Sequence, residues 1–245
     1  MDIGSAFIAA LAAAITINLL TVLALPVSTS QAIVGSIIAI GITSGTLNHA
    51  VLLKILLSWF LSPIGAGIIS YLLYKLLGWL IEARVKNIRV WSLIMKIGFY
   101  LVGIYGAYTL GANNVANTTG IFVKAGMVDL KTALLVGSGT IALGVLTYSR
   151  GVMTTVGKRI TSMSDLAALT ATLAMDITVH IFTWVGVPVS TSQAIVGSVG
   201  GVGLVKSTRS IDLKVIGKIG VGWLGTIVLS LAFTIALLKL GTVIF

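Results

Sequence analysis

The sequence contains no cysteine, and charged side chains make up only 9% of its 245 residues. The absence of cysteine excludes disulfides, thiolate nucleophiles and cysteine-ligated metal sites. A soluble domain carries roughly 25% charged residues, whereas 57% of this chain is hydrophobic and its mean hydropathy is +1.11. This composition is that of an integral membrane protein.

Acidic residues are especially scarce, with 6 Asp and Glu against 16 Lys and Arg, and the net charge is +10. The basic residues gather in short clusters between apolar runs, as in Arg84–Arg89 and Lys206–Lys218. Lys and Arg beside membrane spans follow from the positive-inside rule and from attraction to lipid headgroups. We therefore expect membrane lipid, and not nucleic acid, as the partner of this charge, and a multi-pass position in the plasma membrane.

Five or six apolar stretches are long enough to cross the hydrocarbon, which takes about 20 helical residues. Helix breakers at Ser62–Gly67 and Gly220–Gly225 leave open whether the second and sixth stretches are single helices or broken pairs. The expected fold is an all-α, polytopic membrane protein. The six stretches lie near Ile3–Leu25, Ala50–Leu80, Val90–Leu110, Leu130–Tyr148, Leu166–Val187 and Leu213–Phe245.

The segment PVSTSQAIVGS occurs twice without change, at Pro26–Ser36 and at Pro188–Ser198. At the same offset, the apolar stretch Ile3–Leu25 aligns with Asp165–Val187. Internal repeats are typical of secondary transporters, whose sites lie at discontinuous helices. The sequence therefore predicts a duplicated transporter.

The repeat sets the predicted domain boundaries. Residues 1–85 would hold the second part of repeat one, and residues 86–245 a complete repeat two. Met1 aligns with Met163, so the first half of repeat one, about 70 to 80 residues, has no counterpart in this sequence. We expect that the sequence starts late, at an internal methionine, and the alternative is a natural short form.

Three polar segments interrupt the apolar pattern: the two PVSTSQ copies, and GANNVANTTG at Gly111–Gly120. Polar, irregular backbone at membrane depth persists only where it is buried in protein or lines a watery cavity. In each PVSTSQ copy the proline ends one helix, and Ser28 or Ser190 can cap the next. We expect two re-entrant half-helices, at 26–44 and 188–206, and a break in the helix at 111–120.

These segments carry complementary chemistry. A helix that begins within the membrane directs free N–H groups and its positive dipole end toward an anion, and Ser and Thr hydroxyls add donors. Two such helix starts facing one another could hold one tetrahedral oxyanion. Asparagine amide oxygens coordinate hard cations or accept from a protonated oxyanion, so the combination predicts symport. The alternative is that the small polar residues only line helix contacts.

Asp176 is the one carboxylate deep in a predicted span, and His180 follows it on the same helical face. Intramembrane ionisable groups are functional candidates, but these two side chains could equally pair with each other or with backbone. Ser190 with His180 and Asp176 would suit an intramembrane hydrolase. Because the acid and the histidine share one helix face, and Ser28 has neither nearby, we expect that the protein is not an enzyme.

GANNVANTTG resembles the GANDVAN signature of the PiT family of inorganic phosphate transporters, and PVSTSQAIVG resembles that family's PVSTTHAIVG segment. The resemblance implies an inverted-repeat transporter that moves phosphate with Na⁺ or H⁺ as coupling ion and needs no cofactor. The predicted phosphate-binding residues are Ser28, Thr29, Ser30, Gln31, Ser190, Thr191, Ser192, Gln193, Asn113 and Asn117. The predicted cation-coupling residues are Asn113, Asn114, Asn117 and Asp176, with Na⁺ at the three asparagines.

The chain departs from the family pattern at three points. Asn114 stands where the family has an aspartate, which removes a carboxylate for Na⁺ or a proton, and Asp176 is the candidate substitute. Ser-Gln replaces the family's Thr-His in both copies, at Ser30–Gln31 and Ser192–Gln193. The family order GAN, PVST, GAN, PVST is reduced to PVST, GAN, PVST.

Three functions follow as hypotheses. The first is a phosphate transporter that works by alternating access, with a second copy of the chain as candidate partner in a homodimer. The second is a permease for sulfate or another tetrahedral oxyanion, because the change at Asn114 weakens recognition of the proton that phosphate carries. The third is a non-transporting fragment or structural subunit.

Overall fold

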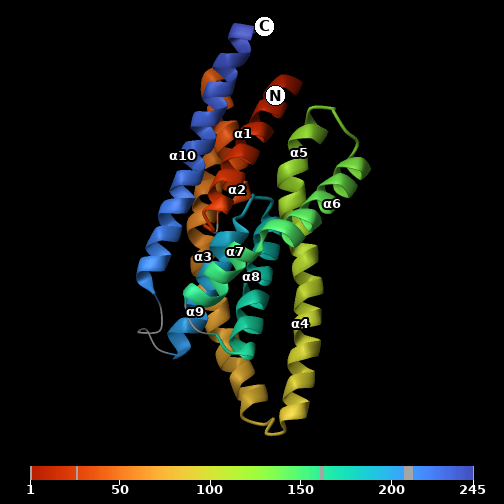
Figure 1. Cartoon of the computed structure of the whole chain (residues 1–245), viewed down its shortest axis with the longest axis vertical. Helices are drawn as coiled ribbons and strands as arrows, with labels where there is room; N and C mark the ends of the chain where they lie inside the picture. Colours follow the sequence, from red (N-terminus) through yellow and green to blue (C-terminus); the bar gives the residue numbers. More distant parts are fainter. Residues whose placement is uncertain (1, 26, 161–162, 207–211, 245) are drawn as a thin grey trace. The chain divides into compact units, whose positions relative to one another are not determined.

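The computed structural model describes residues 2–25, 27–160, 163–206 and 212–244, and none of these residues forms a strand. Three short π-helices, labelled η, extend or join the α-helices. The elements in chain order (Figure 1) are α1 (Ile3–Val22), α2 (Thr29–Ser44), α3 (His49–Leu77), η1 (Gly78–Glu82), α4 (Ile88–Leu110), η2 (Gly111–Val115), α5 (Ala116–Lys124), α6 (Leu130–Tyr148), α7 (Arg150–Thr154), η3 (Thr155–Arg159), α8 (Asp165–Val185), α9 (Thr191–Lys206) and α10 (Leu213–Ile244).

Within the described residues, 6 helical stretches are long and apolar enough to cross a membrane. The all-α, multi-pass fold predicted from the sequence is therefore confirmed. The second and sixth stretches are single helices, because α3 continues through Pro63 and α10 continues through Gly220–Gly225. The spanning stretches are Ile3–Val22, His49–Glu82, Ile88–Lys124, Leu130–Tyr148, Asp165–Val185 and Lys214–Leu240.

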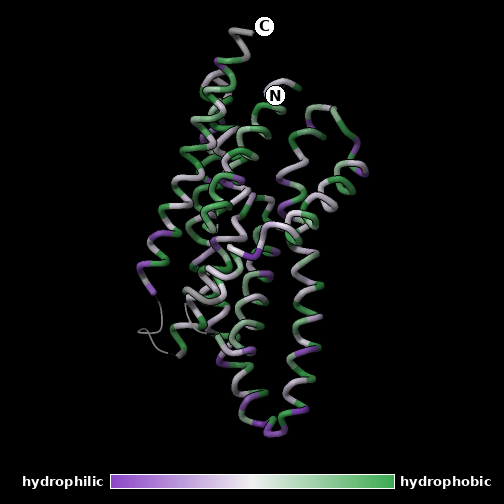
Figure 2. The backbone as a smooth tube through the Cα atoms, viewed as in Figure 1, coloured by the Kyte–Doolittle hydropathy of each residue, from purple (hydrophilic) through white to green (hydrophobic). Residues whose placement is uncertain are grey.

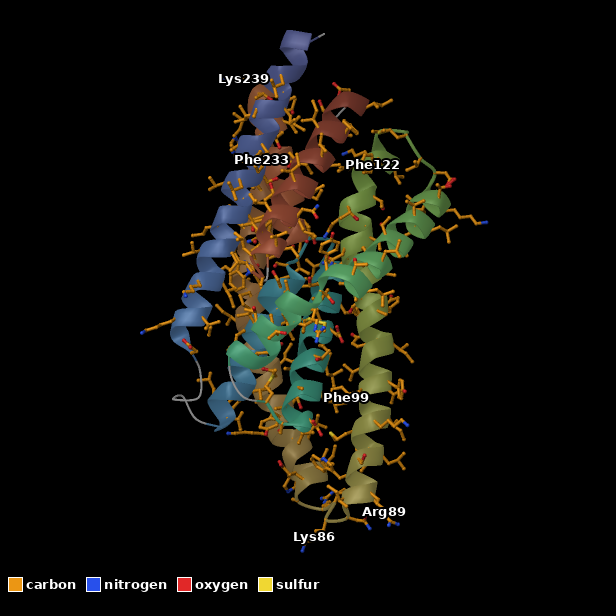
Figure 3. The ribbon with its side chains drawn as sticks, viewed as in Figure 1. Lys86, Arg89, Phe99, Phe122, Phe233 and Lys239 are labelled. Atoms are coloured by element: carbon orange, nitrogen blue, oxygen red, sulfur yellow. The ribbon has the colours of Figure 1, made fainter. Side chains whose placement is uncertain are left out.

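Polar residues concentrate at the connections between these helices. Figure 2 shows hydrophobic colour along the helix bodies and hydrophilic colour where α3 turns into α4. Lys86 and Arg89 lie at that turn (Figure 3), and both side chains are exposed. At another connection Asp129 caps α6 by accepting the N–H of Thr132 at 2.7 Å, and this hydrogen bond lowers the pKa of the Asp129 carboxyl.

The two PVSTSQ copies each lead into a helix of 16 residues, α2 and α9, which is shorter than the roughly 20 residues that a span requires. The predicted serine caps are confirmed. The Oγ atoms of Ser28 and Ser190 accept the N–H groups of Gln31 and Gln193, each at 3.2 Å. Pro26, which the sequence assigned to the end of the preceding helix, lies outside the described residues.

The GANNVAN segment differs from expectation, because the chain stays helical where a break at 111–120 was predicted. Gly111–Val115 forms the π-helix η2, which joins α4 to α5. A π turn takes in an extra residue while the backbone groups remain hydrogen-bonded. A fully unwound stretch would leave those groups without partners, and hydrocarbon penalises this strongly.

The chain forms two compact units, and each takes segments from both halves of the sequence. Unit 1 comprises Met1–Lys54, Asn114–Met153 and Gly217–Phe245, and unit 2 comprises Ile55–Asn113 and Thr154–Ile216. The short helix of each repeat therefore lies in a unit with the long helix of the other repeat: α2 with most of α10, and α9 with most of α3. The division into repeats at residue 85 stays a prediction from the sequence, since packing follows a different division.

Serines at equivalent repeat positions form hydrogen bonds between each short helix and the long helix that it packs against, and we call these two helices an exchanged pair. In unit 2 the Ser70 hydroxyl on α3 donates to the carbonyl oxygen of Ser198 on α9 at 2.7 Å. In unit 1 the Ser230 hydroxyl on α10 donates to the carbonyl oxygen of Ala32 on α2 at 2.5 Å, and its Oγ lies 2.7 Å from the Oγ of Ser36. All these serines are buried, so each exchanged pair carries interhelical hydrogen bonds of the kind common in membrane proteins.

Glycines on the short helices allow the long helices to approach closely. A Cβ at Gly197 would collide with the backbone of Pro63, and a Cβ at Gly201 would collide with the backbone of Gly67. In unit 1, a Cβ at Gly35 would lie 3.0 Å from the carbonyl oxygen of Ile227. Contacts through such small residues let backbones approach and pack in lipid, where hydrophobic association between helices is absent.

The Gly197 contact can be tested by substitution. Gly197→Ala forces α3 and α9 apart, and we expect a loss of about 1–3 kcal/mol in the free energy of unfolding, typical of overpacking. Gly200→Ala is the matched control, because a Cβ there meets no atom within 4 Å and alanine is the better helix former by roughly 0.5–1 kcal/mol. Thermal unfolding in detergent measures both. Equal melting temperatures for the two variants would contradict the close contact.

Candidate functional site

The start of α9 in unit 2 gathers four of the predicted phosphate-binding residues. Ser190 is 0% exposed and Gln193 is 6% exposed. The Ser190 Oγ caps the helix and also lies 3.0 Å from the Oγ of Ser192. Thr191 and Ser192 are half-buried. Buried hydroxyls and first-turn N–H groups therefore meet at the positive end of this helix dipole.

Asn113 fixes Val189, which precedes the capping residue Ser190. Its Nδ2 donates to the carbonyl oxygen of Val189 at 2.9 Å, and its Oδ1 accepts the Val189 N–H at 3.4 Å. Both Asn113 and Val189 are buried. The Asn113 amide thus pairs with both backbone groups of one residue and orients the chain as it enters Ser190. Its expected contact with phosphate or a cation stays a prediction.

The start of α2 in unit 1 holds the other copy of the motif. Asn117 on α5 donates from Nδ2 to the Oγ of Ser30 at 3.0 Å, and Ser28, Ser30 and Gln31 are all buried. Thr29 is half-buried. The GANNVAN segment therefore supplies an asparagine to each short helix: Asn113 to α9 in unit 2, and Asn117 to α2 in unit 1.

The π-helix η2 contains the first two asparagines of this segment. Asn114 is 8% exposed, and its backbone carbonyl oxygen accepts a hydrogen bond from the Thr118 hydroxyl at 2.8 Å. π turns within long helices occur frequently at functional sites. The structure thus places the three predicted asparagines where the helix departs from α geometry or directly after it.

Gln31 and Gln193 share an unusual feature. Gln31 is 2% exposed, and in both glutamines the buried Oε1 atom has no hydrogen-bond partner among the described residues. A buried acceptor without a partner costs about 1–3 kcal/mol. An unsatisfied acceptor repeated at equivalent positions beside donor-rich helix starts is suited to a ligand that brings its own donor or a cation.

Asp176 and His180 lie on α8 in unit 2 and each finds its partner on α4. Thr109 donates from Oγ1 to the Oδ1 of Asp176 at 3.3 Å, and the Tyr105 hydroxyl lies 2.7 Å from the Nδ1 of His180. Asp176 and His180 therefore do not pair with each other, which was the alternative predicted from the sequence. The Ser190 hydroxyl bonds within its own helix turn, so the three residues do not form a hydrolase triad.

Thr109, Tyr105 and Gly106 were not predicted from the sequence as residues of the site. A threonine, a tyrosine or a glycine on an apolar helix carries no local signal of function, and only the packing of α4 beside α8 (Figure 1) brings them to Asp176 and His180. Gly106 is needed at this contact, because a Cβ there would lie 2.9 Å from the Oδ2 of Asp176.

The chain is similar in sequence to proteins named as phosphate and sulfate permeases. A protein of Methanocaldococcus jannaschii, provisionally named a phosphate permease, is 33% identical over 218 residues, which cover 89% of this chain and 69% of the relative. The sulfate permease CysP of Bacillus subtilis is 31% identical over 203 residues, which cover 83% of this chain and 57% of the relative.

The fold has a counterpart among solved structures, and the sequence matches a family profile. A solved structure of a sodium-dependent phosphate transporter has a TM-score of 0.83 to this chain at 23% identity, covering 100% of this chain and 82% of the other. That likeness establishes the fold. The profile of the phosphate transporter family matches residues 2–234. The chain belongs to the phosphate transporter family.

Proposed function

We propose that the chain is a secondary active transporter that moves inorganic phosphate across the membrane, by symport with Na⁺ or H⁺ and by alternating access. Family membership and the six candidate membrane spans among the described residues support a transport function. The observation that carries the choice of phosphate is the unsatisfied Oε1 atom of Gln31 and of Gln193.

Phosphate and sulfate are both tetrahedral oxyanions, but at neutral pH only phosphate carries a proton. The N–H groups and hydroxyls at the starts of α2 and α9 are donors, which suit any oxyanion oxygen. A glutamine carbonyl oxygen is an acceptor, and it suits a P–OH group. Each helix start therefore combines donors for the charged oxygens with one acceptor for the protonated oxygen.

With Na⁺ as the coupling ion, the asparagines would be its ligands. Amide oxygens are hard ligands that coordinate hard cations, and Asn113, Asn114 and Asn117 lie in or next to the π-helix η2. A cation that binds beside the anion offsets part of its charge, so each ion raises the affinity for the other. This mutual stabilisation is the thermodynamic basis of symport.

Sulfate transport is the second candidate. The 31% identity to the sulfate permease CysP favours it, as does Asn114, which offers no carboxylate to accept the phosphate proton. Labelled phosphate uptake into proteoliposomes, with sulfate as competitor at equal concentration, separates the two. Strong competition by sulfate would indicate that sulfate, and not phosphate, is the preferred substrate.

The helix-start assignment predicts the behaviour of a double variant. Replacing Ser190 and Thr191 with alanine removes two hydroxyls from the start of α9, and we expect the apparent KM for phosphate to rise about tenfold or more, because each lost hydrogen bond to a charged group is worth about 1.5–3 kcal/mol. Initial rates of uptake across a range of phosphate concentrations measure this change.

Ser164→Ala is the control for that variant. Ser164 caps α8 through the N–H of Ala167, so its replacement also costs about 1 kcal/mol of cap stability without touching either PVSTSQ copy. We expect uptake by Ser164→Ala to match the wild type. If the double variant kept the wild-type KM, the start of α9 would not be the binding site.

The glutamine acceptors predict selectivity. Gln31→Met and Gln193→Met keep the side-chain length and remove the carbonyl oxygen, so phosphate loses an acceptor for its proton while sulfate loses nothing. We expect the preference for phosphate over sulfate to fall by about tenfold in each variant, which corresponds to about 1.4 kcal/mol. Competition assays with both labelled anions measure the ratio, and an unchanged ratio would refute the role of Gln31 and Gln193.

A further inference from the structure

We propose that Asp176 is the proton-binding group that couples transport to a pH gradient. This inference rests on the proposed transport function and specifies its coupling ion as H⁺. Asp176 lies within a small polar cluster of unit 2 that also contains Thr109, Tyr105 and His180.

Among the described residues, the buried Asp176 has the Thr109 hydroxyl as its side-chain partner. Its side chain is 0% exposed in the middle of α8, and its hydrogen bond from Thr109 is long, at 3.3 Å. The Oδ2 atom has no partner among the described residues. An ionised carboxylate in this position is expensive unless a cation joins it. The site therefore calls for either a bound proton or a bound metal cation at Oδ2.

The limited space and the small number of nearby oxygen ligands favour a proton over a metal cation at Oδ2. The backbone of α4 lies against the carboxylate, because a Cβ at Gly106 would stand 2.9 Å from Oδ2 and 3.1 Å from Oδ1. Hard metal cations require several oxygen ligands. Among the described residues, Asp176 belongs to no group of three or more His, Cys, Asp or Glu side chains that could hold a metal. A proton needs only the one free oxygen.

His180 lies one turn further along α8 than Asp176 and completes the polar cluster. Its Nδ1 lies 2.7 Å from the hydroxyl of Tyr105, while its Nε2 is buried and has no partner among the described residues. The rings of Tyr108 and Trp184 pack against the imidazole, with centroids 5.4 Å and 4.8 Å away. The imidazole therefore keeps one buried nitrogen without a partner among the described residues, on the same face of α8 as Asp176.

The other elements around α8 bring few titratable groups to this cluster. From α4, the facing groups are Tyr105 and Tyr108. The helix α3 presents Ala66 to the middle of α8, and its Tyr74 packs toward Leu166 at the other end. Residues 191–205 of α9 include no titratable side chain. Asp165 is exposed at the first turn of α8.

The cluster is linked to the start of α9 through α4. Thr109, which holds Asp176, precedes Asn113 by one turn, and Asn113 pairs with the backbone of Val189. Protonation converts Asp176 from an acceptor into a group that can also donate. Its hydrogen bond with Thr109 then changes. One helical turn separates Thr109 from Asn113, and the Asn113 side chain carries the change to Val189, the residue before Ser190.

Transport driven by a pH gradient tests the proposal. Purified wild-type protein and Asp176→Asn are placed in proteoliposomes with the membrane potential clamped at zero, and labelled phosphate is added with a gradient of about one pH unit. With one proton coupled per anion, the wild type accumulates phosphate about tenfold. Asp176→Asn keeps the shape of the side chain, and we expect it to exchange labelled for unlabelled phosphate without accumulating it.

Asp165→Asn is the matched control on the same helix, and it should accumulate phosphate like the wild type. Accumulation by Asp176→Asn equal to that of the wild type would overturn the proposal. So would wild-type accumulation that follows a Na⁺ gradient and ignores the pH gradient.

A spectroscopic measurement distinguishes failure of this inference from failure of the proposed function. Infrared difference spectra recorded against pH on the detergent-solubilised protein should show a protonated carboxyl band that is present in the wild type, absent in Asp176→Asn and shifted in Thr109→Val. If the wild type neither transports nor exchanges phosphate and this band appears, the transport function is wrong and proton binding stands. If the band is missing from the wild type at every pH, proton binding by Asp176 is wrong.

Discussion

Hydrocarbon offers no hydrogen bonds, so every polar group inside this protein needs an internal partner, and the rest of the structure follows from that constraint. The serine caps at Ser28 and Ser190 satisfy N–H groups at the starts of the two short helices. The GANNVAN segment keeps its backbone paired through a π turn. Asn113 matches both backbone groups of Val189, where the chain enters α9.

The same constraint shapes the packing of the two units. Each short helix contacts the long helix of the other repeat through glycine and serine, as at Gly197 in unit 2 and Gly35 in unit 1. Small side chains let the backbones approach, and hydroxyls such as those of Ser70 and Ser230 add interhelical hydrogen bonds. These contacts supply the van der Waals packing and hydrogen bonding that drive association in a membrane.

Against this background, four of the buried polar atoms that lack partners among the described residues belong to residues of the proposed sites. Gln31 and Gln193 each leave one carbonyl oxygen unsatisfied, beside helix starts that are rich in donors. Asp176 and His180 leave one atom each, on the face of α8 that packs against α4. In our proposals the glutamine pair serves the protonated oxyanion and Asp176 serves the coupling proton, so the two ions would use separate groups of residues.

Hydropathy and capping depend on residues close together in the chain, so the helical class, the membrane spans and the serine caps could be predicted from the sequence alone. It also pointed to the two PVSTSQ helix starts and the asparagines, because an unchanged repeat and polar residues in apolar surroundings are visible without coordinates. Three features could not be predicted from the sequence: α3 and α10 each pack with the short helix of the other repeat, GANNVAN continues as a π-helix, and Asp176 contacts Thr109 and Gly106 instead of His180. These outcomes depend on contacts between residues far apart in the sequence, which leave no local pattern.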